Sequence, residues 1–137
     1  MSNSTAARKP PITMIDTEAD RLADMAIGIE DRLPQVSQLL LDEIGRAKVC
    51  RQNQIPSDVV TMHATVQFVD EASGKEHSYQ LVYPKDADIS AGRVSILTPV
   101  GAGLIGLREG QSILWPGRDG QKRKLTILKV TQAETAD

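Results

Sequence analysis

The chain has 137 residues, enough for one compact domain and a small appendage. Apolar residues make up 40% and charged residues 25%, close to the globular average, so neither a disordered chain nor a membrane protein is indicated. A net charge of −2 and only one Trp, two Tyr and one Phe argue against a nucleic-acid coat and an aromatic-lined cofactor pocket. The single cysteine cannot form an intramolecular disulfide, and we expect a cytoplasmic protein.

The first third of the chain is predicted to be helical after a flexible leader. Residues 1–15 mix Ser, Asn, Thr and Pro without an apolar period, which is typical of a mobile leader. Apolar residues then recur at the spacing of one helical face, and Pro34 ends one helix but suits the first turn of the next. We therefore expect a short antiparallel helical hairpin over residues 17–50, about 20 Å long, within a helical unit spanning residues 16–54. The two apolar stripes are Leu22, Met25, Ala26, Ile29 and Leu33, then Val36, Leu39, Leu40, Ile44 and Ala47.

The remaining residues, 55–137, are expected to form an antiparallel sheet of about five strands packed on one short helix, so the fold class is α+β. Pro99 opens that helix, which should cover residues 100–105. Uneven alternation of apolar residues in the last strand indicates a β-bulge or burial on both faces. The predicted strands are residues 59–69, 76–83, 93–97, 111–115 and 121–131.

Residues 101–106 match the spacing G-x-G-x-x-G of dinucleotide-binding loops. That function needs a long helix after the glycines, because its N-terminus holds the pyrophosphate, but a turn follows here. Close packing of a short helix on the sheet is the preferred interpretation. His63, His77 and Cys50 lack the spacing of a zinc site, so neither a metal nor a cofactor is predicted.

The adjacent carboxylates of Glu30 and Asp31 fall at the bend of the predicted hairpin. Two acids in that position could help to hold a magnesium ion offered by a partner. Ordinary solvation of an exposed bend is the alternative interpretation, and the residues alone favour it.

Residues 58–130 resemble the C-terminal domain of the bacterial Gre transcript-cleavage factors. The run 95–111 (SILTPVGAGLIGLREGQ) is comparable to the Gre stretch S-P-x-x-x-x-L-x-G followed by G-D. Within that superfamily the chain is closer to the Rnk-type regulators of nucleoside diphosphate kinase, as residues 58–62 (DVVTM) and 81–84 (LVYP) indicate. The short hairpin agrees with this, and the resemblance covers roughly residues 14–131.

The resemblance implies an FKBP-like C-terminal fold and binding to RNA polymerase beside its secondary channel. In Gre factors the residues just before and at the motif proline touch the polymerase. Carried over, these are Leu97, Thr98 and Pro99, and Val100 follows them. Leu97 is apolar where Gre factors have an acidic or amide residue, so an apolar contact could replace a polar one there.

Gre factors place paired acids at the tip of a long coiled coil near the catalytic magnesium, whereas Glu30 and Asp31 end an arm of only about 20 Å. Because catalysis needs groups held to within about an ångström, we predict docking without cleavage. The expected protein is a non-enzymatic, monomeric regulator that competes with Gre-type factors, meets DNA only through the polymerase and affects nucleoside diphosphate kinase indirectly. The alternatives are an active cleavage factor using both acids, and an FKBP-like peptidyl-prolyl isomerase, which four scattered aromatic residues make improbable.

Overall fold

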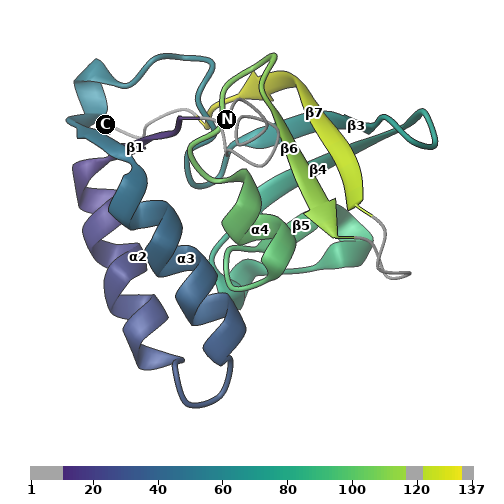
Figure 1. Cartoon of the computed structure of the whole chain (residues 1–137). Coiled ribbons are helices and arrows are strands. Elements are labelled where there is room, and N and C mark those ends of the chain that lie inside the picture. Colours follow the sequence, from purple (N-terminus) through teal and green to yellow (C-terminus); the bar gives the residue numbers. More distant parts are fainter. Residues whose placement is uncertain (1–10, 117–121, 134–137) are drawn as a thin grey trace, which may run out of the picture.

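The computed structural model describes residues 11–116 and 122–133, and they form the mixed α+β fold that the sequence predicts (Figure 1). Two 13-residue helices come first, and a five-stranded sheet with one short helix follows. No helix among the described residues is long and apolar enough to cross a bilayer. The elements are β1 (Thr13–Ile15), α2 (Asp16–Gly28), α3 (Pro34–Arg46), β2 (Lys48–Cys50), η1 (Gln52–Gln54), β3 (Thr65–Asp70), β4 (Lys75–Val82), η2 (Pro84–Asp86), η3 (Ile89–Ala91), β5 (Arg93–Ser95), α4 (Pro99–Leu104), β6 (Ser112–Pro116) and β7 (Lys122–Thr131).

Helices α2 and α3 run side by side in opposite directions (Figure 1). Leu22 and Ala26 of α2 are fully buried, as is Leu40 of α3, so most of both predicted stripes faces the interior. The prediction is wrong for Leu33, which is exposed because it lies in the loop after α2 has ended. Buried Ser37 donates a hydrogen bond from Oγ to the Ala26 carbonyl oxygen at 2.7 Å, which joins the start of α3 to the end of α2. The second helix ends at Arg46, four residues before the predicted limit, because residues 48–50 form strand β2.

The prediction that residues 1–15 are a mobile leader is wrong for its last residues. Residues 13–15 form β1, which pairs in parallel with β2, and Ile12 and Met14 are each only 2% exposed. The Thr13 amide also donates to the Gly106 carbonyl oxygen at 3.1 Å. Three residues are too few to show a period, and their partners lie more than thirty positions away, so local patterning could not reveal them. The rest of the predicted leader, residues 1–10, lies outside the described residues.

The sheet has the strand order β5-β4-β3-β7-β6. All neighbours are antiparallel except β4 and β5, which are parallel, so the prediction of an antiparallel sheet is wrong at that edge. The reason is the segment 83–92, which carries η2 and η3 and turns the chain back to the level of Gln80 before β5 begins beside the end of β4. The predicted bulge is present in β7: Gln67 faces Lys129 and Phe68 faces Ile127, so Leu128 is the extra residue.

The first strand of the sheet begins at Thr65, not at residue 59 as predicted. Val60 and Met62 are buried as the alternation requires, but residues 61–64 form a turn in which the Ala64 amide donates to the Thr61 carbonyl oxygen at 3.1 Å. His63 takes φ +70° there, a left-handed conformation that favours glycine or asparagine and costs a histidine on the order of 1 kcal/mol. Val59 and Thr61 are buried as well, so burial does not alternate here. The alternation of apolar and polar residue types was therefore mistaken for strand geometry.

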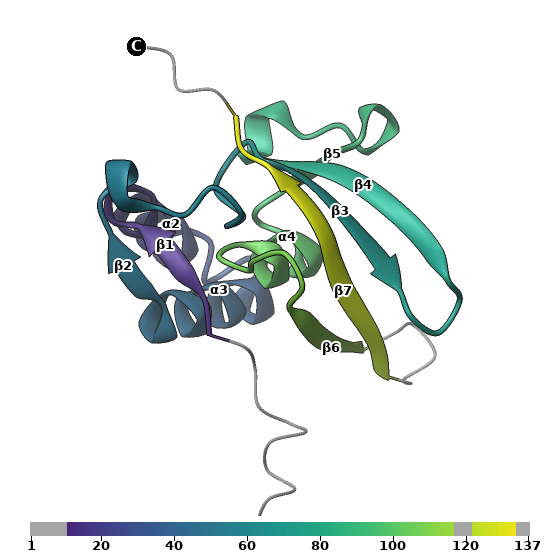
Figure 2. The same cartoon turned by 90° about the horizontal axis from the view of Figure 1, so that it is seen from above.

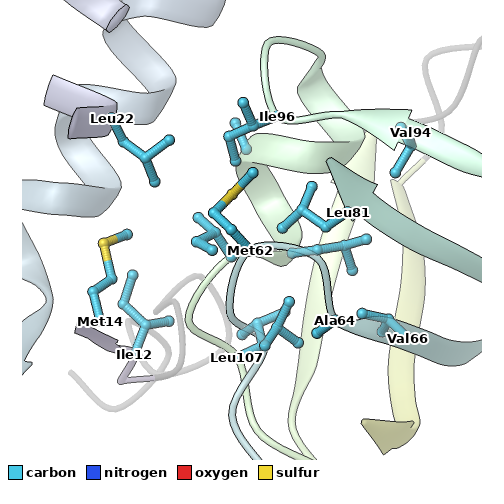
Figure 3. Packing of buried hydrophobic residues seen from close by; sticks show 14 of the residues in the cluster. Ile12, Met14, Leu22, Met62, Ala64, Val66, Leu81, Val94, Ile96 and Leu107 are labelled. Atoms are coloured by element: carbon cyan, nitrogen blue, oxygen red, sulfur yellow. The ribbon is translucent and has the colours of Figure 1, made fainter. Parts of the chain in front are cut away.

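Helix α4 lies between the helix pair and the concave face of the sheet (Figure 2). One apolar cluster runs from the N-terminal segment and α2 through Met62 to the strands (Figure 3). The glycines of the G-x-G-x-x-G pattern serve this packing, as predicted. A Cβ atom on Gly101 would lie 2.2 Å from the Ser95 carbonyl oxygen, and Gly106 takes φ +86° as the chain leaves the helix.

Replacing Gly101 with alanine should destabilise the protein by about 1–3 kcal/mol or more, because the new methyl group meets backbone atoms that cannot move aside. The matched control is Gly45→Ala in α3, where a Cβ has nothing within 4 Å and should stabilise the helix by about 0.5–1 kcal/mol. Urea unfolding measures both variants. Equal stabilities of Gly101→Ala and the wild type would contradict this packing.

Candidate partner-binding surfaces

The four predicted contact residues, 97–100, comprise the end of the link between β5 and α4 and the first two residues of α4, and are called the Pro99 segment below. Two hydroxyl groups fix its backbone. Ser95 Oγ accepts a hydrogen bond from the Leu97 amide at 3.0 Å. Thr98 Oγ1 donates to the Ser95 carbonyl oxygen at 2.7 Å and accepts from the Gly101 amide at 3.1 Å. Thr98 is thus the N-cap of α4, and Pro99 occupies the first helical position, where no N–H is needed.

The structure brings the four residues of the Pro99 segment together but gives them different surroundings. Pro99 is exposed, whereas Leu97 and Val100 are half-buried and pack against the core. The Thr98 hydroxyl is already used inside the chain, so it holds the segment in shape. Ser95, which the sequence prediction did not single out, also holds the backbone of the segment through its bond with the Leu97 amide. The spacing of Ser95 and Thr98 directly before a proline was the available signal, because hydroxyl side chains there commonly close turns and cap helices.

The acidic pair lies in the loop 29–33 that joins α2 to α3, here called the helix-tip loop. Backbone bonds from the Leu33 amide to the Ile29 carbonyl oxygen at 2.8 Å, and from the Arg32 amide to the same oxygen at 3.0 Å, make it a tight turn. Glu30 and Asp31 are both exposed. Since each helix has 13 residues, the acids stand at the end of an arm about 20 Å long.

No hydrogen bond or ion pair connects the helix-tip loop with the Pro99 segment in the described part of the chain. Glu30 and Asp31 also do not belong to a metal-binding cluster, because no three His, Cys, Asp or Glu side chains of the described residues are grouped to hold an ion. The two sequence-predicted sites are thus formed by separate segments that share no hydrogen bond or ion pair among the described residues.

A third surface is a hollow around His63 that the sequence did not indicate. It consists of two adjoining cavities of about 250 and 440 Å³, and His63 lines both. The first lies against α2, with Glu18, Arg21 and Tyr83 on its walls, and the second is lined by residues that include Lys85. We call both together the His63 hollow. Its residues come from α2, the turn 61–64 and the segment 80–93, so no local motif could reveal it.

Ionisable groups of the first cavity are held close together. Glu18 Oε1 accepts a hydrogen bond from the Met62 amide at 3.2 Å, and burial raises the pKa of this carboxyl group. The Arg21 guanidinium stands 5.7 Å from the centre of the Tyr83 ring, a cation–π distance. Burial and the nearby Glu18 raise the pKa of Tyr83. The His63 ring meets Tyr83 edge to face at 5.5 Å.

Comparison with known proteins assigns the chain to a family. The family model of the transcription elongation factor GreA/GreB C-terminal region matches residues 55–132, which contain the sheet, the Pro99 segment and most of the His63 hollow. The chain belongs to the GreA/GreB transcription elongation factor family. The matching model is that of a transcription elongation factor.

Individual relatives cover most of the chain. The regulator of nucleoside diphosphate kinase of Escherichia coli (strain K12) is 33% identical over 122 residues, or 89% of this chain and 90% of that protein. GreA of Acidiphilium cryptum (strain JF-5) is 35% identical over 102 residues, or 74% of this chain and 62% of that protein. The structure of a GreA/GreB elongation factor from Nitrosomonas europaea is 40% identical, with a TM-score of 0.70, and covers 90% of this chain and all of that one. These matches confirm the predicted resemblance to Gre factors and to Rnk-type regulators.

The capping role of Thr98 can be tested without touching the exposed proline. Thr98→Val keeps the shape of the side chain but removes both hydroxyl bonds, and should cost about 1 kcal/mol of stability. Thr98→Ser keeps the hydroxyl and should cost markedly less. Thermal unfolding of both variants gives the answer, and an identical loss in the two would show that the hydroxyl group does not hold the segment.

Glu18 should make stability depend on pH. Its pKa is raised above the ordinary 4.5 in the folded chain, so the folded state binds the proton more tightly than the unfolded state does. The favourable contribution is full below pH 4.5 and is lost as the pH rises through the folded-state pKa. Glu18→Gln keeps an oxygen for the Met62 amide and should be at least as stable as the wild type at pH 7, with the difference shrinking toward pH 4. The prediction would be contradicted if the stability difference between Glu18→Gln and the wild type were less favourable to the variant at pH 7 than at pH 4.

Proposed function

We propose that this GreA/GreB family member binds RNA polymerase beside its secondary channel through the Pro99 segment and competes there with Gre-type factors without stimulating transcript cleavage. On this proposal the chain contacts DNA only within the polymerase complex. An effect on nucleoside diphosphate kinase, which the name of the Escherichia coli relative suggests, would follow indirectly from this regulation. We also infer that the curled sheet around α4 has an FKBP-like arrangement, with the helix pair as a short coiled-coil arm.

The length of the helix pair is the observation that carries the proposal. Both helices have 13 residues, so Glu30 and Asp31 stand only about 20 Å from the base of the arm. The similarity to the Escherichia coli regulator spans 90% of that protein, whereas the similarity to GreA of Acidiphilium cryptum leaves more than a third of GreA unmatched. Carboxylates that stop short of the catalytic magnesium cannot orient it, because metal assistance requires direct or water-mediated contact.

The Pro99 segment has the properties of a docking surface. Its backbone is held by the Ser95 and Thr98 bonds, so little conformational entropy is lost on binding. Pro99 presents a rigid apolar ring to solvent, between the half-buried side chains of Leu97 and Val100. A rigid apolar centre of this kind is what a small, specific protein contact needs.

Binding to purified core RNA polymerase tests the docking part. Pro99→Asp should weaken binding at least about tenfold, equivalent to about 1.4 kcal/mol, because it puts a charge into the apolar contact. The matched control is Pro84→Asp, since Pro84 is also an exposed proline at the first position of a short helix. Circular dichroism should show both variants folded. Equal affinities of Pro99→Asp, Pro84→Asp and the wild type would refute the assignment.

A backtracked elongation complex tests the absence of cleavage activity. The wild-type chain should leave intrinsic cleavage unchanged and should lower the cleavage that an added Gre factor stimulates. Replacing both Glu30 and Asp31 with alanine should change neither result. Stimulation by the wild type that disappears in the double variant would instead identify an active cleavage factor.

A further inference from the structure

The conformation of His63 is difficult to explain by folding alone. It is the only residue other than glycine with positive φ in the described ranges 11–116 and 122–133. The turn is fixed on both sides, because the His63 amide donates to the Leu81 carbonyl oxygen at 2.6 Å and the His63 carbonyl oxygen accepts from Gln80 Nε2 at 3.0 Å. Glycine would make the same backbone bonds without strain. What histidine adds is an imidazole ring at the junction of two cavities.

The donors around this ring are not used up within the chain. Neither the His63 side chain nor Lys85 makes a hydrogen bond or ion pair with any described residue. Arg21 faces the Tyr83 ring, makes one side-chain hydrogen bond to Tyr83 and lies near the Glu18 carboxyl group, but no carboxylate is within salt-bridge distance of it among the described residues. Its other N–H groups remain available. Together the three side chains offer guanidinium, imidazole and ammonium N–H groups.

Most acids of the hollow are already engaged. Glu18 accepts from the Met62 amide, and Asp88 accepts from Ser90 Oγ at 2.6 Å and lies 3.9 Å from Arg93. Burial raises the pKa of Glu18, whose carboxyl group lies near Arg21 in the first cavity. Asp86 is the acid that opposes an anion here, and it is exposed on the wall of the second cavity. The polar groups of the hollow that remain available to a ligand are therefore mainly hydrogen-bond donors.

We propose that the His63 hollow binds the phosphate group of a small ligand through Arg21 and His63, which line the first cavity, with Lys85 adding positive charge from the second cavity. Guanidinium and ammonium groups make charge-assisted hydrogen bonds to phosphate oxygens, and arginine can do so with two parallel bonds. The cavity against α2 is large enough for a phosphate group, and the second cavity leaves room for the body of an organic phosphate. This site is independent of polymerase binding by the Pro99 segment.

Titration of the full-length protein with inorganic phosphate and with glycerol 3-phosphate tests the proposal. The imidazole signals of His63 in an NMR spectrum should shift and saturate, while those of His77, on β4 beside Phe68, should not. Arg21→Gln and Lys85→Gln should each weaken binding about tenfold. A tighter glycerol phosphate complex would identify an organic phosphate as the ligand, and equal affinities would identify the free anion. Absence of a saturable His63 shift, or an equal shift with acetate at the same ionic strength, would overturn the proposal.

A substitution at His63 separates binding from structure. His63→Gly should raise the midpoint of thermal unfolding by about 3–5 °C, because the strained turn relaxes, and should abolish the stabilisation that phosphate gives the wild type. His77→Asn is the control and should keep that stabilisation. Phosphate stabilisation that persists in His63→Gly would show that the anion binds elsewhere.

Discussion

The contact between α4 and the backbone of β5 determines the positions of the other elements. The helix can enter the concave face of the sheet only because Gly101 has no side chain where the Ser95 carbonyl oxygen lies. From there α4 packs against α3 on its other side, so the helix pair and the sheet share one core. The same contact fixes the start of the helix, and with it the exposed ring of Pro99. The packing constraint and the proposed docking surface are thus consequences of one close approach.

The helix pair has a second constraint, which is its length. Both helices bury apolar residues against the shared core. The hydrogen bond from Ser37 to the Ala26 carbonyl oxygen joins the two helices near the helix-tip loop. Extending such a pair would expose new apolar stripes that only a longer partner helix could cover. The acids of the helix-tip loop therefore remain near the body of the protein. Under the proposed function, a family member built in this way would bind the polymerase without reaching its catalytic metal.

Signals carried within a few residues were predictable from the sequence. The 3.6-residue period of the apolar residues predicted both helices, and Pro99 predicted the start of α4. The uneven alternation of apolar residues around Leu128 indicated the bulge. Features that depend on distant pairing were not predictable. Strand β1 is defined by residues 48–50, and the parallel direction of β5 by the route of the segment 83–92.

The candidate sites divide in the same way. The Pro99 segment could be located from a motif, since its four residues are consecutive. The hollow could not, because Arg21, His63 and Lys85 come from separate segments and the residue types around the turn at His63 alternate as in a strand.

The distance from the helix-tip loop to the catalytic metal of bound RNA polymerase tests the central claim most directly. A spin label on Asp31→Cys, in a Cys50→Ser background, can be measured against Mn²⁺ placed in the polymerase active centre. The account predicts a complex in which the label is too far from the metal for a side chain at residue 31 to be a ligand. A label at residue 31 in contact with the metal would contradict it.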